Sequence, residues 1–191
     1  MNNNTTVFSI TYDIESFPIL EEVSLELTIQ ATSGDLLDLH GKPLSKKWTP
    51  LNLKWFYDDQ NLENGLPDIA LWRAGEYACS EEILPIIKKI TKNSCEFLPL
   101  KVGEANWFAI HTLKTVDAID REQTIFNLRA NGKVNRTKKF KKLVLKSDVI
   151  NEAGLCHVKD AGLHTYCSEA FHSEITNMGI RGLIFNKRQT S

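Results

Sequence analysis

Apolar residues occur in short stretches along this chain, and that shortness limits what the chain can fold into. The most apolar segments, residues 83–90 and 143–145, fall far below the roughly 18 residues of a membrane-spanning helix. With 191 residues, 42% apolar and 25% charged, the composition excludes collagen-like, coiled-coil and wholly disordered chains. We therefore expect one domain with its own core, with two small lobes as the alternative.

The first part of the chain has the pattern of β-strands. Residues 7–12 are rich in β-forming side chains, and residues 23–29 alternate apolar with polar residues, as in a half-buried strand. A polar connection at residues 58–68 is the expected boundary. We predict a strand-rich, acidic N-terminal lobe over residues 1–65 and an α+β region over residues 66–191, packed together as one compact unit.

The second part predicts strand–helix–strand units. Ser80 and Ser168 are expected to cap two helices, and Gly179 to end the second one. Asn131-Gly132 predicts a hairpin turn. Strands are expected at residues 77–79, 95–100, 107–113 and 182–185. The predicted fold class is α+β, with a strand-rich N-terminal lobe followed by this mixed region.

Charge is segregated along the sequence. Residues 1–82 hold 14 acidic and 5 basic side chains, a balance of −9, whereas residues 83–191 hold 10 and 18, a balance of +8. Residues 123–147 contain eight bases and no acid. Such blocks produce opposite surface fields that suit docking to a partner, although charged faces also serve solubility. Nucleic acid is the weaker candidate for residues 129–146, because Phe140 is their one aromatic residue and no nucleic-acid-binding module is recognisable.

The cysteines bear on the compartment and on chemistry. Cys79, Cys95, Cys156 and Cys167 are unclustered, as is usual for free thiols in a reducing cell. The start of the chain lacks the cationic and apolar segments of a signal peptide, so we expect a cytoplasmic location. Cys79 or Cys167 with His111 is the one nucleophile–base combination worth testing, but no motif brings them together.

Metal and acid–base sites receive little support from the spacing of residues. Cys156, His157, His164, Cys167 and His172 include zinc-ligand types without the paired spacing of zinc sites. Asp117 and Asp120 are explained by a turn cap and by pairing with Arg121. We therefore expect no metal, no cofactor and no enzymatic activity.

Aromatic residues beside charged ones are candidate contacts with a protein partner. Trp55 and Tyr57 precede Asp58 and Asp59, and aromatic anchors rimmed by acids suit a pocket on a basic protein. The basic segment supplies the complementary candidates. The predicted partner-binding residues are Trp55, Tyr57, Asp58, Asp59, Trp72, Lys138 and Lys139.

A series of short motifs carries a family resemblance. In chain order the motifs are Gly41-Lys42-Pro43-Leu44, Trp48-Thr49-Pro50, Leu66-Pro67-Asp68, Cys79-Ser80-Glu81, Glu96-Phe97-Leu98-Pro99-Leu100, Trp107-Phe108-Ala109-Ile110-His111, Val116-Asp117-Ala118-Ile119-Asp120, Cys167-Ser168-Glu169-Ala170-Phe171 and Gly179-Ile180-Arg181-Gly182-Leu183-Ile184-Phe185. Over residues 31–185 the chain resembles a bacterial family of immunity proteins that occur beside polymorphic toxins (immunity family eleven, formerly a domain of unknown function). It departs from the family pattern at Cys167-Ser168, where a larger apolar residue followed by Ser-Asp is expected.

The resemblance implies a cytoplasmic, non-enzymatic protein that binds a cognate toxin domain and blocks it by direct occlusion. The producing cell and its siblings would be protected, usually in the setting of contact-dependent secretion. If the toxin is a basic nuclease, the acidic half of the chain would imitate nucleic acid. Two alternatives remain open: a Cys/His-dependent hydrolase or modifying enzyme that reverses toxin damage, and a nucleic-acid accessory protein that uses residues 129–146. Self-association is a further open point.

Overall fold

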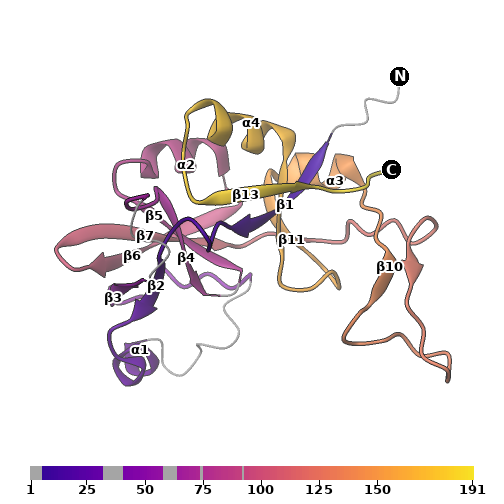
Figure 1. Ribbon diagram of the computed structural model, residues 1–191, viewed down its shortest axis with the longest axis horizontal. Helices are drawn as coiled ribbons and strands as arrows, with labels where there is room; N and C mark the ends of the chain where they lie inside the picture. Colours follow the sequence, from indigo (N-terminus) through magenta and orange to yellow (C-terminus); the bar gives the residue numbers. More distant parts are fainter. Residues whose placement is uncertain (1–5, 32–40, 58–63, 74, 92) are drawn as a thin grey trace.

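The two ends of the chain meet in one sheet (Figure 1). The computed structural model describes residues 6–31, 41–57, 64–73, 75–91 and 93–191. The first sheet has the order β13-β1-β12-β11-β8 and is antiparallel except for the pair β11–β8. Its strands are β1 (Val7–Tyr12), β8 (Thr115–Val116), β11 (Leu155–Val158), β12 (Thr165–Ser168) and β13 (Leu183–Lys187).

The second sheet is strongly curled. It has the order β2-β3-β6-β7-β5-β4, and its two edge strands lie against each other. There the Glu22 carboxylate accepts hydrogen bonds from Trp72 Nε1 at 3.2 Å and Arg73 Nε at 2.8 Å. The sheet therefore approaches a closed barrel. Its strands are β2 (Ile19–Glu22), β3 (Leu51–Phe56), β4 (Ile69–Arg73), β5 (Glu76–Ser80), β6 (Cys95–Val102) and β7 (Ala105–Thr112).

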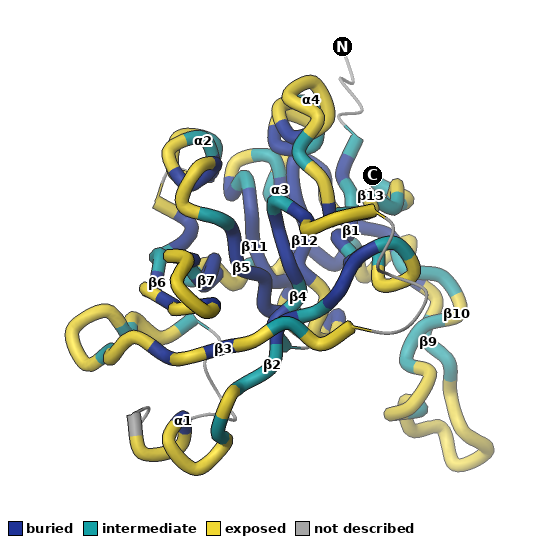
Figure 2. Tube along the Cα trace, turned by 60° about the vertical axis from the view of Figure 1, so that its left-hand side comes forward, coloured by how far each residue is buried: buried dark blue, intermediate teal, exposed yellow. Residues whose placement is uncertain are grey.

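Helices cover the apolar faces of the sheets. α2 (Leu84–Thr91) and α4 (Glu169–Asn177) contact each other, and Ile87 and Ile175 from them join a core shared by both sheets. α3 (Ser147–Ala153) packs on the other face of the first sheet through Ile150. Figure 2 shows the buried strands at the centre, with the exposed sides of the helices turned outward. None of the helices described is long and apolar enough to cross a membrane.

The predicted α+β class is confirmed, since the chain forms two strand-rich, largely antiparallel sheets together with helices that pack on them. The Ser168 side chain accepts the Phe171 N–H at 3.2 Å and caps α4, and Gly179 follows that helix with φ of +66°. Both sequence segments, residues 1–65 and 66–191, contribute strands to each sheet: β1 pairs with β12 and β13, and β3 pairs with β6.

Two local predictions are wrong. Residues 23–29 do not form a strand, because α1 (Leu25–Ala31) starts there; the Ser24 hydroxyl accepts the Leu27 N–H at 3.3 Å and provides the turn with a cap. Ser80 does not cap α2. It is the last residue of β5, paired with Trp107, and the helix begins only after residue 83, whose carbonyl accepts the Ile87 N–H.

Candidate functional site

The tryptophans predicted as partner contacts pack inside the curled sheet. Trp72 is buried, 5% exposed, and its ring meets Trp48 edge-to-face with ring centroids 6.2 Å apart. Trp55 is half-buried and meets Trp107 in the same geometry at 5.2 Å. These contacts give all four rings a structural role. The assignment of Trp55 and Trp72 to a partner surface stays a prediction.

The other predicted contacts lie in different parts of the molecule. Tyr57 is exposed just after β3, whereas Asp58 and Asp59 lie outside the described residues. Lys138 and Lys139 precede β10 (Phe140–Lys142), at the opposite end of the long axis from β3 (Figure 1). The structure therefore does not bring the aromatic and the basic candidates together.

Lys138 and Lys139 belong to a two-stranded ribbon that projects from the body (Figures 1 and 2). β9 (Ile125–Phe126) pairs with β10, and Leu128 bridges to Val134 nearer the tip. The tip is the predicted turn, in which Gly132 has φ of +77° and its N–H bonds to the Arg129 carbonyl at 2.9 Å. We call residues 125–142 the basic arm.

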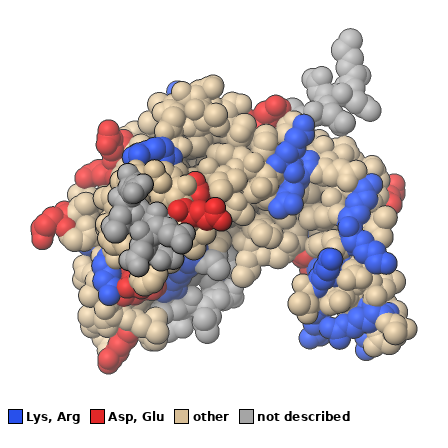
Figure 3. Space-filling model, viewed as in Figure 1, with Lys and Arg blue, Asp and Glu red and all other residues tan. Residues whose placement is uncertain are grey.

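The basic arm carries seven cations and no acid. Lys and Arg side chains gather over this projecting part of the molecule (Figure 3). These cations are Arg129, Lys133, Arg136, Lys138, Lys139, Lys141 and Lys142. Within the described part of the chain, Lys139 forms an ion pair, with Asp160 at 3.5 Å, and the other six do not. Like charges along a ribbon repel one another. An isolated ribbon is also only marginally stable, so these charges do not stabilise the arm and are presented to solvent.

Acids of the N-terminal half are more often compensated within the molecule. Glu21 pairs with Lys54 at 3.0 Å, Glu22 with Arg73, and Asp68 with Arg181 at 3.6 Å. Asp35, Asp38, Asp58, Asp59 and Glu63 lie outside the described residues. Within the described residues, the charges of the basic arm are therefore the less compensated of the two blocks.

The base of the arm is held firmly. Thr124 Oγ1 exchanges hydrogen bonds with the backbone of Val144, at 3.2 and 3.1 Å, and Phe126 packs on Phe140 with ring centroids 5.4 Å apart. Asp120 accepts the N–H groups of the next turn, and Asp117 pairs with Arg121 at 3.6 Å. The prediction that Asp120 caps a turn and that Asp117 pairs with Arg121 is thus confirmed. The contacts at its base fix the direction in which the arm leaves the body.

His111 lies in a buried clamp that sequence reasoning did not identify. Its Nε2 is 3.0 Å from the Lys42 carbonyl oxygen, and its ring lies between Glu76 and Glu96, with N–O distances of 3.7 and 3.9 Å. Glu96 also accepts the N–H groups of Leu44 and Ser45. Burial by itself lowers the pKa of His111, but the nearby Glu76 carboxylate, the Lys42 carbonyl and the Glu96 carboxylate raise it overall. The clamp holds residues 42–45 on the second sheet.

The thiols are poorly suited to nucleophilic chemistry. All four cysteines are free and buried. Burial raises the pKa of Cys79 and Cys156 to about 12 and of Cys95 to about 11, and it raises that of Cys167 further. Since the thiolate is the reactive form, these groups are inert near neutral pH. His111 is engaged with Lys42 and two carboxylates, so the geometry lends no support to the Cys–His alternative.

The histidines among the residues with zinc-ligand side chains are engaged in other contacts. His157 Nδ1 lies 3.4 Å from the His164 carbonyl oxygen, and the ring of His172 stacks on Phe8 at 4.1 Å between centroids. No group of three or more His, Cys, Asp or Glu side chains suited to a metal ion occurs among the described residues.

Comparison with known proteins identifies the family. No curated protein matches the chain. The model of the Immunity protein family (Imm11) matches residues 54–190, which include β4 to β13, the basic arm and His111 with both of its carboxylate neighbours. Since that match covers well over half of the sequence, the chain belongs to the Imm11 family of immunity proteins.

Proposed function

We propose that this protein neutralises a cognate toxin domain by binding it and covering its working surface, and that the basic arm is a principal contact. The observation that carries the proposal is the arm itself. Six of its cations lack an ion pair with the described residues, and Ile125, Leu128 and Val134 are exposed among them. Cations interspersed with apolar side chains suit a protein face that is acidic and partly apolar.

A nucleic acid is the second candidate ligand, because a two-stranded ribbon fits the major groove of DNA. Two features favour a protein instead. The chain as a whole has a net charge of −1, so the part outside the arm holds −8 and repels phosphates. The arm also exposes aliphatic residues, and its aromatic pair, Phe126 and Phe140, is packed ring against ring near its base.

We place the action in the cytoplasm, where it would protect the producing cell and its siblings from a toxin delivered between neighbours. Four free thiols support this location, because an oxidising compartment favours disulfides. Binding without turnover is the proposed mode of action, and the inert thiols support it.

The test is calorimetric titration of the protein with the C-terminal domain encoded immediately upstream of its gene, in a catalytically inactive form. We expect a saturable complex with Kd below 1 µM. The variant K133E/R136E/K138E should weaken binding about 10- to 100-fold, mainly through a slower association rate that also loses its dependence on salt.

The matched control is K46E/K89E/K187E, which changes the net charge by the same amount at exposed lysines outside the arm. It should bind within about twofold of the parent protein, because steering depends on where the charges lie. Equal weakening by the two variants would refute the role of the arm. Salt-dependent binding of duplex DNA or RNA, combined with no binding of the toxin domain, would favour the nucleic-acid candidate.

A further inference from the structure

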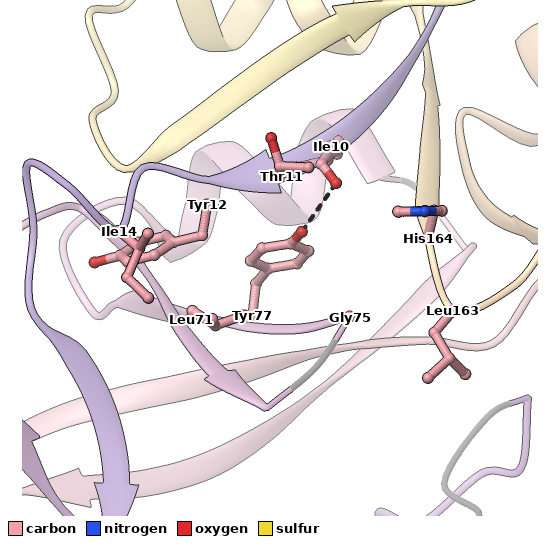
Figure 4. A pocket seen from close by; sticks show the side chains of 9 residues that line it. All are labelled: Ile10, Thr11, Tyr12, Ile14, Leu71, Gly75, Tyr77, Leu163 and His164. Carbon is pink, nitrogen blue, oxygen red and sulfur yellow. Dashed lines mark hydrogen bonds between the residues drawn. The ribbon is translucent and has the colours of Figure 1, made fainter. Parts of the chain in front are cut away.

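A pocket lies where the two sheets meet (Figure 4). Its volume is about 300 Å³, and its lining is mainly apolar. The lining residues are Ile10, Thr11, Tyr12, Ile14, Leu71, Gly75, Tyr77, Leu163 and His164. This volume is at the lower end for small-molecule sites and suits an apolar side chain better than a cofactor.

The walls of the pocket are fixed by hydrogen bonds and by a close backbone approach. The Tyr77 hydroxyl donates to the Ile10 carbonyl at 3.2 Å, which joins β5 to β1. The Thr165 hydroxyl donates to the Gly75 carbonyl, also at 3.2 Å. Gly75 has φ of +80°, and a Cβ there would lie 2.4 Å from the Leu163 carbonyl oxygen. The loop that carries Leu163 is thus seated directly on the turn between β4 and β5, so the pocket is preformed.

The rim of the pocket exposes apolar side chains to solvent. Ile14 is 56% exposed and Leu163 is 58% exposed, on opposite sides of the opening (Figure 4). Large exposed aliphatic residues around an apolar hollow are typical of a protein-binding site, where a partner side chain completes the packing.

The pocket and the basic arm share one loop. Residues 159–164 connect β11 to β12 and supply Leu163 and His164 to the pocket. The same loop supplies Asp160, whose backbone carbonyl accepts Lys139 Nζ at 2.7 Å and whose carboxylate pairs with Lys139 and Arg121. Asp160 has φ of +67°, unusual for a residue other than glycine. The base of the arm and the pocket therefore lie on one continuous surface, which a single partner can contact.

From this continuity we infer that the pocket receives an apolar side chain, of the size of Leu, Met or Phe, from the same toxin face that presents acidic residues to the arm. The inference rests on the proposed function and deepens it by defining the partner chemistry. The acidic residues steer the encounter through the arm, and the apolar side chain supplies desolvated contact that slows dissociation.

The experiment places charge on the rim. In I14D/L163D both substituted side chains are exposed, so we expect the melting temperature to stay close to that of the parent protein. Binding of the upstream-encoded toxin domain should weaken at least tenfold, mainly through faster dissociation, while the salt dependence of association is retained. L25D/M178D places the same two charges on similarly exposed apolar residues outside the pocket and is the matched control, expected to bind like the parent.

A crosslinking measurement tests the contact without relying on affinity. The native thiols are buried, so L163C can be labelled selectively with a benzophenone maleimide and irradiated in the complex. We expect a crosslink to a toxin segment that has an apolar residue near acidic ones, and none from M178C.

Three results would overturn the inference. The first is I14D/L163D binding within twofold of the parent protein, and the second is a crosslink pattern that matches M178C. The third is crosslinking between two copies of this chain in the absence of toxin, which would assign the pocket to self-association. Failure of the proposed function is distinguishable from these results, because the parent protein itself would then not bind the toxin domain.

Discussion

Replacing Gly182 with alanine should destabilise the fold strongly, because this residue lies where the two sheets join. It has φ of +115°, and a Cβ there would lie 1.9 Å from the Ile69 carbonyl oxygen and 3.1 Å from Pro67 Cβ. Ordinary contact begins near 3.4 Å, so the backbone must separate by about 1.5 Å. The Arg181 carbonyl accepts the N–H groups of Asp68 and Ile69 there, at 3.2 and 3.1 Å.

The magnitude follows from what that separation breaks. Loss of the two hydrogen bonds costs about 2 kcal/mol, and the positive φ costs a non-glycine residue about 1–2 kcal/mol. We expect a loss of roughly 3–4 kcal/mol in the free energy of unfolding, and a melting temperature roughly 6–16 °C lower for a chain of this size.

Gly103→Ala is the matched control. Gly103 also has a positive φ, +59°, but a Cβ there meets nothing within 4 Å, so the loss should be about 1 kcal/mol. Urea and thermal unfolding of the two variants measure the difference. If G182A lost no more stability than G103A, the close junction between the sheets would be refuted.

Three further predictions concern the clamp, the thiols and the arm. The folded-state pKa of His111 is raised above its unfolded value near 6.5, so its stabilising contribution is complete below that value and is lost as pH rises through the folded pKa. Urea titrations from pH 5.5 to 9 should therefore give a downward slope of stability that H111Q lacks; parallel curves would exclude the charged clamp. A thiol reagent such as Ellman's should label none of the four cysteines of the native protein at pH 7.5 and all four in denaturant; rapid native labelling would contradict their burial. Trypsin should cut first within residues 129–142, which are basic and mostly exposed. Bound toxin domain should slow this cleavage. Mass spectrometry locates the first cut, and a first cut elsewhere would contradict the projecting arm.

Local signals in the sequence predicted several elements correctly. Ser168 marks the start of α4 and Gly179 follows its end, and Asn131-Gly132 forms the tip of the arm. These features were predictable because caps and turns depend on residues close together in the chain. The apolar alternation at residues 23–29 was misleading. Leu25 and Leu27 are exposed on α1 while Thr28 is buried, so the polarity pattern does not match the buried side.

The candidate site was predictable only in part. The run of bases around Lys138 and Lys139 indicated a charged surface, but not a ribbon that leaves the body. The pocket joins β1, the turn before β5 and the loop after β11, which are far apart in the sequence. The clamp likewise joins residues 42–45 to His111. No spacing rule signals such long-range contacts, so these features emerge only from the tertiary structure.

The central claim, neutralisation by occlusion without turnover, is tested most directly by titrating the activity of the toxin domain with this protein. Occlusion predicts that activity falls in proportion to the protein added and disappears at a fixed molar ratio that does not change with incubation time. Complete loss of activity at substoichiometric amounts of this protein, progressing with time, would show catalysis and contradict the account.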